Sequence, residues 1–296
     1  MWWNGYKIDL REITIIHRRA SIDVHVLPYF GHMDISSITD TEIVDFIAYE
    51  RQCKKICQNS IIANLRIVRW VLDYAVQKDE IERNPFELVK KLKREPTAEF
   101  AIYSPDEVRR LIDAARPKWL GDMILLVYRT GLRKCECFGL QWCDINFEGK
   151  YLTVTRGVTA TKPGERLISD PKTRSSRRIV LLDNICVDML TDRHNKRTSD
   201  IWVFADKTGS LLSPWYLVSY FNETRRRAEI QGKRFYDLRH THITELVSAG
   251  IPLPVIQKRV GHANINMTMH YVHVGVDTQK AVVELLNQNK IQCERR

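Results

Sequence analysis

The sequence has no long apolar segment: none of its apolar runs approaches the roughly 18 residues of a membrane-spanning helix. The first residues, Met1–Gly5, lack the charged and then apolar pattern of a secretory signal. Neither an internal repeat nor a low-complexity tract occurs in the chain. We therefore expect a soluble globular protein of the cytoplasm, with no membrane partner.

The cysteines form no recognisable metal-binding pattern. The chain has seven cysteines, an odd number. Cys53 and Cys57 are separated by three residues and Cys135 and Cys137 by one, and neither pair has a second ligand pair at zinc spacing. Reduced, partly buried thiols in a reducing compartment are the expected state. No carboxylate cluster suited to Mg²⁺ is evident either, so we expect neither a metal nor a cofactor.

Positive charge is in excess and unevenly distributed. The formal net charge is +10. Residues 1–97 contain 15 basic and 14 acidic side chains, whereas the rest of the chain contains 31 and 22. Such an asymmetry favours a polyanionic partner, most simply DNA or RNA, although a merely basic soluble surface would give the same count.

The length of 296 residues suggests about two domains. Residues 10–92 show helical periodicity, with one helix expected from Thr39 or Thr41 to about Arg51 and a long one over 59–78. A charged segment containing Pro96 then predicts a linker. The expected organisation is a helical DNA-binding domain over 1–95, a linker over 96–103 and a catalytic domain over 104–296.

The second part of the chain begins with a clear helix start, in which Ser104 is the cap and Glu107 completes a capping box. Alternating or apolar runs predict strands at 151–155 and 178–182. The fold class expected is therefore mainly α with a small β-sheet insert. The helices are expected near 105–115, 119–130, 134–140, 184–197, 214–228, 237–249, 253–260 and 264–273, with a short apolar helix over 278–287.

Basic side chains on the predicted helices and between the two strands are candidates for contacts with DNA phosphates. Taken alone, each candidate on a helix is better explained as part of a solvated surface. The candidates are Lys54, Lys55, Arg66, Arg69, Arg174, Arg177 and Arg178.

Four short motifs follow one another in the second part of the chain. They are Thr130–Glu136 (TGLRKCE), Pro171–Thr173 (PKT), Tyr236–Thr241 (YDLRHT), and Gly261–His262 followed nine residues later by Tyr271. In this order they resemble the first arginine box, the hairpin lysine motif, the second arginine box, and the closing histidine and nucleophile of the tyrosine recombinase (phage integrase) family. The helical first part looks like that family's SAM-like core-binding domain.

The chemistry of the two arginine boxes agrees with this resemblance. Attack on a DNA phosphodiester builds negative charge on the two non-bridging oxygens. Arginine carries a permanent charge and a planar fork that donates two hydrogen bonds to phosphate. Arg133 and Arg239 are therefore the expected clamp, with electrostatic preorganisation as the main catalytic effect.

The resemblance also assigns the remaining catalytic residues. It implies that Tyr271 forms a covalent 3′-phosphotyrosyl link, which conserves the phosphodiester energy so that rejoining needs no ATP. Lys172 would protonate the leaving 5′ oxygen, and His262 would donate a hydrogen bond to the phosphate. Glu136, Asp237 and His240 are expected to support this site by packing and hydrogen bonding.

One position departs from the family. The second arginine box usually reads His-x-x-Arg, and Tyr236 stands at the histidine position. A phenol is a worse proton acceptor near neutral pH than imidazole, so we expect a working but slow enzyme, with Tyr236 still counted among the catalytic residues. His240 and His242 imitate a metal-binding pair, but packing is the preferred interpretation.

The function that follows is site-specific recombination of double-stranded DNA for a prophage or mobile element. The resemblance implies two subunits per crossover site, four at synapsis, a DNA-bending accessory factor as a further partner, and location at the nucleoid. A catalytically impaired DNA-binding remnant and a type IB topoisomerase relative are the alternatives. The family's extra N-terminal arm-binding domain is expected to be absent or lost.

Overall fold

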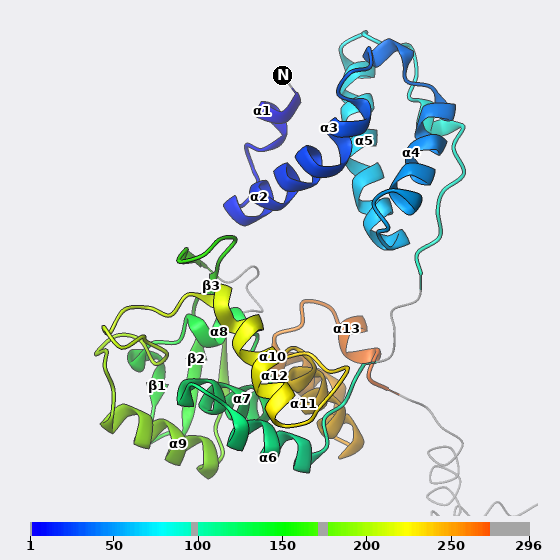
Figure 1. The fold of residues 1–296 in the computed structure, drawn as a ribbon. Helices are drawn as coiled ribbons and strands as arrows, with labels where there is room; N and C mark the ends of the chain where they lie inside the picture. The colour runs from blue at the N-terminus through cyan, green and yellow to red at the C-terminus, as the bar shows by residue number, and fades with distance from the viewer. Residues whose placement is uncertain (1, 96–99, 171–176, 273–296) are drawn as a thin grey trace, which may run out of the picture. The chain divides into compact units, whose positions relative to one another are not determined.

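The computed structural model describes residues 2–95, 100–170 and 177–272. The chain divides into two compact units, 1–99 and 100–296, and each is described by itself. The fold is mainly helical with a small amount of sheet, as the sequence predicts (Figure 1). No described helix has both the length and the apolar character needed to cross a membrane.

The first unit is entirely helical in its described part. Two of its helices are long, and short helical turns connect the others. The elements are α1 (Trp2–Tyr6), α2 (Glu12–Ser21), a π-turn (Ile22–Val26), α3 (Leu27–Phe30), a 3₁₀ turn (Ile35–Ser37), α4 (Asp40–Gln52), α5 (Gln58–Gln77) and a 3₁₀ turn (Pro85–Glu87).

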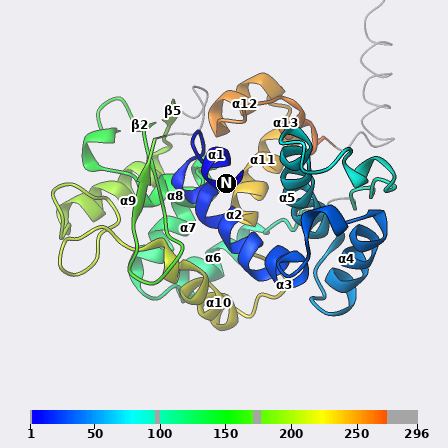
Figure 2. The ribbon, with the colours of Figure 1, turned by 90° about the horizontal axis from the view of Figure 1, so that it is seen from above.

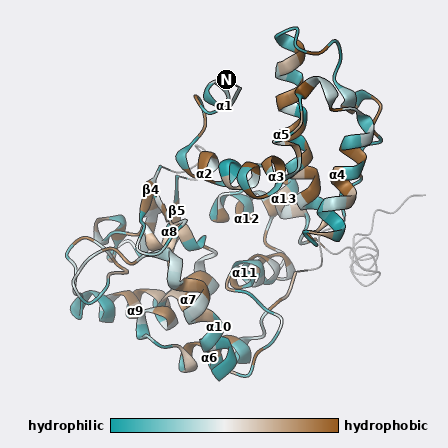
Figure 3. Cartoon of the chain, turned by 45° about the horizontal axis from the view of Figure 1, so that its top comes forward, coloured by the Kyte–Doolittle hydropathy of each residue, from teal (hydrophilic) through white to brown (hydrophobic). Residues whose placement is uncertain are grey.

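Capping and apolar spacing explain the two long helices of this unit. Thr39 and Glu42 form a capping box at the start of α4, which satisfies backbone N–H groups that have no partner within the helix. Figure 3 shows α4 and α5 with apolar and polar patches along their length, as expected for helices that each bury one face. The buried apolar side chains of these helices are Ile43, Phe46, Ile47, Ile61, Leu65, Ile67, Val68, Leu72 and Ala75.

The second unit combines helices with two small sheets. Its helices are α6 (Pro105–Ala114), α7 (Lys118–Thr130), α8 (Lys134–Phe138), α9 (Asn184–Asn195), α10 (Leu217–Arg227), α11 (Asp237–Ser248), α12 (Leu253–Val260) and α13 (Asn266–Met269). Its strands are β1 (Ile145–Asn146), β2 (Tyr151–Val154), β3 (Gly157–Thr159), β4 (Leu167–Ser169) and β5 (Arg178–Leu181).

Most of these bounds lie within a few residues of the predicted ones, and the exceptions are short. The helix expected over 264–273 is limited to α13, and α10 is preceded by a 3₁₀ turn, Pro214–Tyr216. The hairpin of β3 and β4 was not predicted, because strands of three residues are too short to show a periodic pattern. The helix expected over 278–287 lies outside the described residues.

The three-stranded sheet has the order β1-β2-β5 and is antiparallel. Leu152 of β2 pairs with Val180 of β5, and both side chains are buried in the main core of the unit. Figure 2 shows β2 and β5 side by side. Because strand side chains alternate between faces, Arg178 lies on the same buried face of β5 as Val180.

Candidate active site

Two glycine turns form the centre of the site. Gly131 ends α7 with φ 69° and Gly261 ends α12 with φ 67°, a left-handed conformation that glycine adopts without steric cost. A Cβ on Gly131 would lie 2.6 Å from His242 Cδ2, and one on Gly261 would lie 2.9 Å from an Arg178 nitrogen. Space and backbone conformation therefore both require glycine here.

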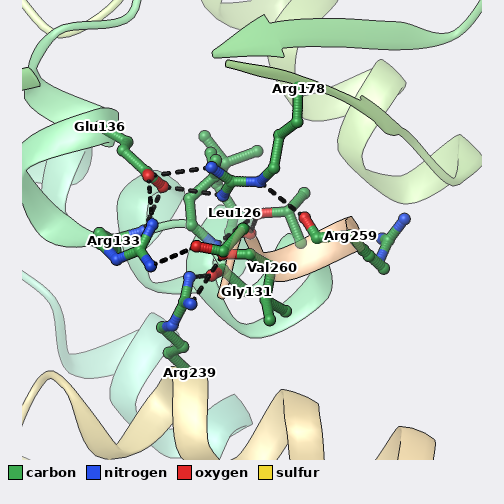
Figure 4. Close-up of polar contacts among 11 residues, drawn as sticks. Leu126, Gly131, Arg133, Glu136, Arg178, Arg239, Arg259 and Val260 are labelled. Atoms are coloured by element: carbon green, nitrogen blue, oxygen red, sulfur yellow. Dashed lines mark hydrogen bonds and ion pairs between the residues drawn. The ribbon is translucent and has the colours of Figure 1, made fainter. Parts of the chain in front are cut away.

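The two predicted arginines bind the carbonyls of these turns (Figure 4). Arg133 directly precedes α8 and donates from Nη2 to the Gly261 carbonyl at 2.7 Å. Arg239, on α11, donates from Nη2 to the Val260 carbonyl at 2.7 Å and from Nη1 to the Gly131 carbonyl. Elements far apart in the sequence thus place both guanidinium groups around the same pair of turns.

Glu136 binds both the side chain and the backbone N–H of Arg133. Its carboxylate accepts from Arg133 Nη1 at 2.8 Å and from the Arg133 backbone N–H at 2.8 Å. It also accepts two bonds from Arg178, each 2.9 Å long, in a bidentate pair. Glu136 thus links Arg133 and Arg178, and its supporting role in the site stays a prediction.

Arg178 differs from the expectation for a DNA contact. Its side chain is 3% exposed, and besides the pair with Glu136 it donates from Nε to the Arg259 carbonyl at 2.7 Å (Figure 4). A guanidinium buried against a carboxylate and the end of α12 is not presented to a phosphate backbone. Its position on the buried face of β5, in phase with Val180, is the signal in the sequence that could have predicted this burial.

Burial and neighbouring charges alter the protonation of this network. Burial alone would raise the pKa of Glu136, but the hydrogen bonds and charge of Arg178, with the charge of Arg133, lower it to about 2. Burial and the repulsion of Arg133 lower the pKa of Arg239 to about 10. Both groups are therefore charged at neutral pH. Arg239 Nε is buried and has no hydrogen-bond partner among the described residues.

His262 follows the second glycine turn. Its Nδ1 lies 2.9 Å from the Thr268 hydroxyl on α13, and the residue is 4% exposed. Burial, together with the charges of Arg239, Arg133 and Arg178, lowers the pKa of His262 to about 3. The imidazole is therefore neutral near pH 7 and retains one N–H that can act as a donor.

Tyr271 lies just after α13 and is buried, with 5% of its surface exposed. Its hydroxyl is 2.5 Å from Nδ1 of His240, and its ring stacks on Phe100 with centroids 4.8 Å apart. The ring of His262 is parallel to within 19°, at a centroid distance of 6.4 Å. Burial raises the pKa of Tyr271, the charge of Tyr236 adds to this, and Arg239 opposes it.

The other predicted residues of the second arginine box have different environments. Tyr236 is 41% exposed, and its ring meets His240 edge-on with centroids 4.9 Å apart. Asp237 is 1% exposed and accepts a 2.7 Å hydrogen bond from the Arg234 backbone N–H, which fixes the turn that leads into α11. Phe100 carries no motif and could not be assigned to the site from sequence.

His240 and His242 have different contacts in the structure. His242 Nδ1 lies 2.9 Å from the Tyr128 carbonyl, and its Nε2 accepts from Arg259 at 3.2 Å, whereas His240 contacts Tyr271. Within residues 2–95, 100–170 and 177–272, no group of three or more His, Cys, Asp and Glu side chains is placed to hold a metal ion.

The remaining predicted residues lie at the edge of the site or away from it. Lys172 and Arg174 fall outside the described residues. Arg177 is exposed and lies with His262 in the lining of an open cavity of about 790 Å³. In the first unit, Arg69 lies 4.0 Å from Asp73, and Lys54 lies over the ring of Tyr49. Lys55 and Arg66 are exposed.

Comparisons with known proteins identify the family of the chain. Residues 102–277 match the phage integrase family, and residues 1–50 match the N-terminal SAM-like domain of phage integrases. The first match covers more than half of the chain. The protein therefore belongs to the phage integrase family, as the four motifs predict.

The relatives include recombinases and integrases of mobile elements. The chain is 26% identical over 335 residues to a tyrosine recombinase XerC-like protein of Caldanaerobacter subterraneus subsp. tengcongensis, covering 96% of this chain and 85% of the relative. It is 25% identical over 300 residues to the ICEBs1 integrase of Bacillus subtilis, covering 95% of this chain and 79% of that protein.

A solved structure of the Tn1549 transposon integrase in complex with circular intermediate DNA shares the fold. Its TM-score is 0.78 at 21% identity, and the match covers 96% of this chain and 98% of that one. A lambda integrase tetramer bound to a Holliday junction matches with a TM-score of 0.68 at 18% identity, over 92% of this chain and 75% of that one.

Proposed function

We propose that this tyrosine-type site-specific DNA recombinase cleaves and rejoins DNA with Tyr271 as its nucleophile and Arg133 and Arg239 as its phosphate clamp. The observation that carries the proposal is the arrangement of these two arginines. Both guanidinium groups are held by carbonyls of the Gly131 and Gly261 turns, with His262 and Tyr271 following the second turn. The clamp is thus formed before substrate binds, which is the condition for electrostatic catalysis.

The unpaired donor of Arg239 supports this assignment. A buried N–H without a partner costs about 1–3 kcal/mol, and such groups are few in folded proteins. A phosphate oxygen would supply the acceptor that Arg239 Nε lacks within the described residues. His262, neutral and buried, would donate a further hydrogen bond, and Lys172 would protonate the leaving 5′ oxygen.

The partner proposed is double-stranded DNA at a crossover site, bound by two subunits per site and four at synapsis. The net charge of +10 suits a polyanionic partner. Exposed Lys55 and Arg66 in the first unit and Arg177 in the second are proposed phosphate contacts. The C-terminal residues from Thr278 onward are proposed to dock on a neighbouring subunit, and a DNA-bending factor is proposed to assist.

The test is to trap the covalent intermediate. Wild-type protein incubated with a nicked suicide substrate that carries the crossover site should form an adduct with a 3′-phosphotyrosyl bond. Tyr271→Phe, which removes only the hydroxyl, should bind the same DNA with unchanged affinity and form no adduct. An adduct with the Phe variant would exclude Tyr271 and point to another tyrosine, such as Tyr220 or Tyr236.

A further inference from the structure

Tyr236 occupies the position at which the second arginine box usually has a histidine, yet the structure supplies an imidazole from the next turn of the same helix. We propose that His240, rather than Tyr236, accepts the proton of the Tyr271 hydroxyl during cleavage. This inference rests on the proposed role of Tyr271 as nucleophile, and it adds a catalytic residue to that site.

The first support is direct contact with the reacting atom. His240 Nδ1 lies 2.5 Å from the Tyr271 hydroxyl oxygen, within the reach required of a general base. Within the described part of the chain, no other side chain is hydrogen-bonded to this hydroxyl. The Tyr236 ring, by contrast, meets the His240 ring edge-on, and the residue is 41% exposed.

The second support is the periodicity of α11. Residues four apart lie on the same face of an α-helix, one turn from each other. His240 is four residues after Tyr236, so it occupies the same face one turn further into the helix. Arg239 lies beside it and holds the two glycine turns, so the imidazole and the phosphate clamp have neighbouring positions on one rigid element.

The third support is the packing around the imidazole. Phe100 stacks on His240 with ring centroids 4.0 Å apart and an interplanar angle of 17°, and it stacks on Tyr271 as well. One apolar ring therefore covers both partners of the hydrogen bond. Such stacking limits the tilt of both rings and so helps to keep the imidazole beside the hydroxyl.

Burial, more than the surrounding charges, keeps His240 unprotonated near neutral pH. Burial lowers its pKa to about 4, with Asp237 opposing and Arg239 and Arg234 adding to the shift. Nδ1 is then a free acceptor when Nε2 carries the proton. The titratable or charged groups that face it are Tyr236, Asp237 and Arg239 on or beside α11, Arg234 before it, His262 after α12, and Tyr271.

The step balances as follows. The Tyr271 oxygen forms a bond to phosphorus as its proton moves to His240 Nδ1. The bond between phosphorus and the 5′ oxygen breaks, its electron pair stays on that oxygen, and the oxygen takes up the proton that the proposed function assigns to Lys172. The phenol becomes acidic only as its oxygen bonds to phosphorus, so the transfer accompanies attack. A phosphate bound nearby is negative and raises the basicity of the imidazole. In rejoining, His240 returns the proton to the tyrosine.

The decisive variants separate a proton acceptor from a residue that only orients Tyr271. His240→Asn keeps an oxygen acceptor near the Nδ1 position but cannot take up a proton, whereas His240→Ala removes both properties. An exposed histidine of the first unit, His32, provides the matched control His32→Asn. Single-turnover cleavage of a suicide substrate is measured for each variant across acidic to basic pH, beside DNA affinity and thermal unfolding.

Loss of general-base help predicts that His240→Asn and His240→Ala slow cleavage alike, by about 10²–10⁴-fold, at unchanged DNA affinity. The wild-type rate should fall toward acidic pH as His240 becomes protonated, and this fall should be missing in His240→Asn. Rescue of cleavage by asparagine would overturn the proposal, since only orientation would then matter. A Tyr236→Phe variant as slow as His240→Asn would also overturn it.

A substrate with a 5′-bridging sulfur gives a second readout that folding defects do not change. Sulfur leaves without protonation, so this substrate should not restore the rate of His240→Asn, although it should restore that of Lys172→Ala. Restoration of His240→Asn would mean that His240 assists the leaving group instead. If Tyr271→Phe still forms the adduct, the proposed function fails; if only His240→Asn cleaves normally, this inference alone fails.

Discussion

The arginine network and the nucleophile are held in place by different forces. Ion pairs with Glu136 fix Arg133 and Arg178, and hydrogen bonds to backbone carbonyls hold these two and Arg239 (Figure 4). Tyr271 is held by stacked rings and one hydrogen bond from its hydroxyl. The charged half of the site therefore has many directional bonds, whereas the reactive half has mainly apolar contacts.

This difference fits the two proposed roles, which are stabilisation of the transition state by the arginines and attack on phosphorus by Tyr271. Charges that stabilise a transition state are most effective when they need no rearrangement during the reaction. A nucleophile must advance toward phosphorus, so contacts through ring faces, which are weaker and less directional, suit it better. Many directional bonds thus hold the arginine network in place. Burial among the rings keeps Tyr271 protonated.

The largest expected effect is the loss of stability on replacing Glu136, which lies at the centre of the charged half. Glu136→Ala leaves Arg178 buried without its carboxylate, and breaking a buried ion pair costs about 3–5 kcal/mol. Chemical denaturation should show this loss in the free energy of unfolding. A double variant, Glu136→Met with Arg178→Met, should recover much of the stability but cleave slowly, because Arg133 has lost a support.

Normal cleavage by the double variant would show that Arg133 is positioned without Glu136. It would contradict the view that ion pairs hold the charged half of the site in place. As a control, Arg109→Ala, which removes a surface ion pair with Asp106, should change stability by no more than about 1 kcal/mol.

The next effect concerns the shape of the clamp. Arg239→Lys keeps the positive charge but cannot bind the Val260 and Gly131 carbonyls and a phosphate together. By analogy with loss of one oxyanion donor, we expect cleavage to slow by about 10²–10³-fold. Single-turnover cleavage, compared with DNA affinity by gel shift, checks this. Near-normal cleavage with lysine would mean that charge alone, and not the fork, is needed.

The charged half should also respond to acid in a defined way. The pKa of Glu136 is lowered to about 2 in the folded protein, against an ordinary value of about 4.3 when the chain is unfolded. Its stabilisation is therefore complete above about pH 5 and is lost as the pH falls toward 2. Glu136→Gln should flatten this part of the stability profile measured by denaturation at several pH values; an unchanged slope would contradict the lowered pKa.

The smallest effect is expected in the aromatic half. Phe100→Leu keeps the apolar volume but removes the stacking on His240 and Tyr271, which is worth about 0.5–1.5 kcal/mol. Phe100→Tyr keeps the ring and is the matched control. Thermal unfolding should separate the two variants; equal stability would show that burial, and not ring geometry, holds the nucleophile.

Local sequence patterns were enough to predict most of the helices and the two longer strands. Ser104 and Glu107 announce the start of α6 through a capping box, and the structure contains that box. The order of the four motifs predicted the family, and the comparisons confirm it. The positions of Lys172 and Arg174 remain predictions, since they lie outside the described residues.

The sequence determined by itself the helices, the strands that flank the hairpin, the family and the candidate nucleophile, because capping, periodicity and motif spacing act over a few residues. The tertiary structure was needed to see which charges neutralise each other. It paired Arg178 with Glu136, placed His240 beside the Tyr271 hydroxyl and covered both rings with Phe100. Those contacts join residues 31 to 171 positions apart, and they form only when the packed core brings α8, β5, α11 and the end of α13 together.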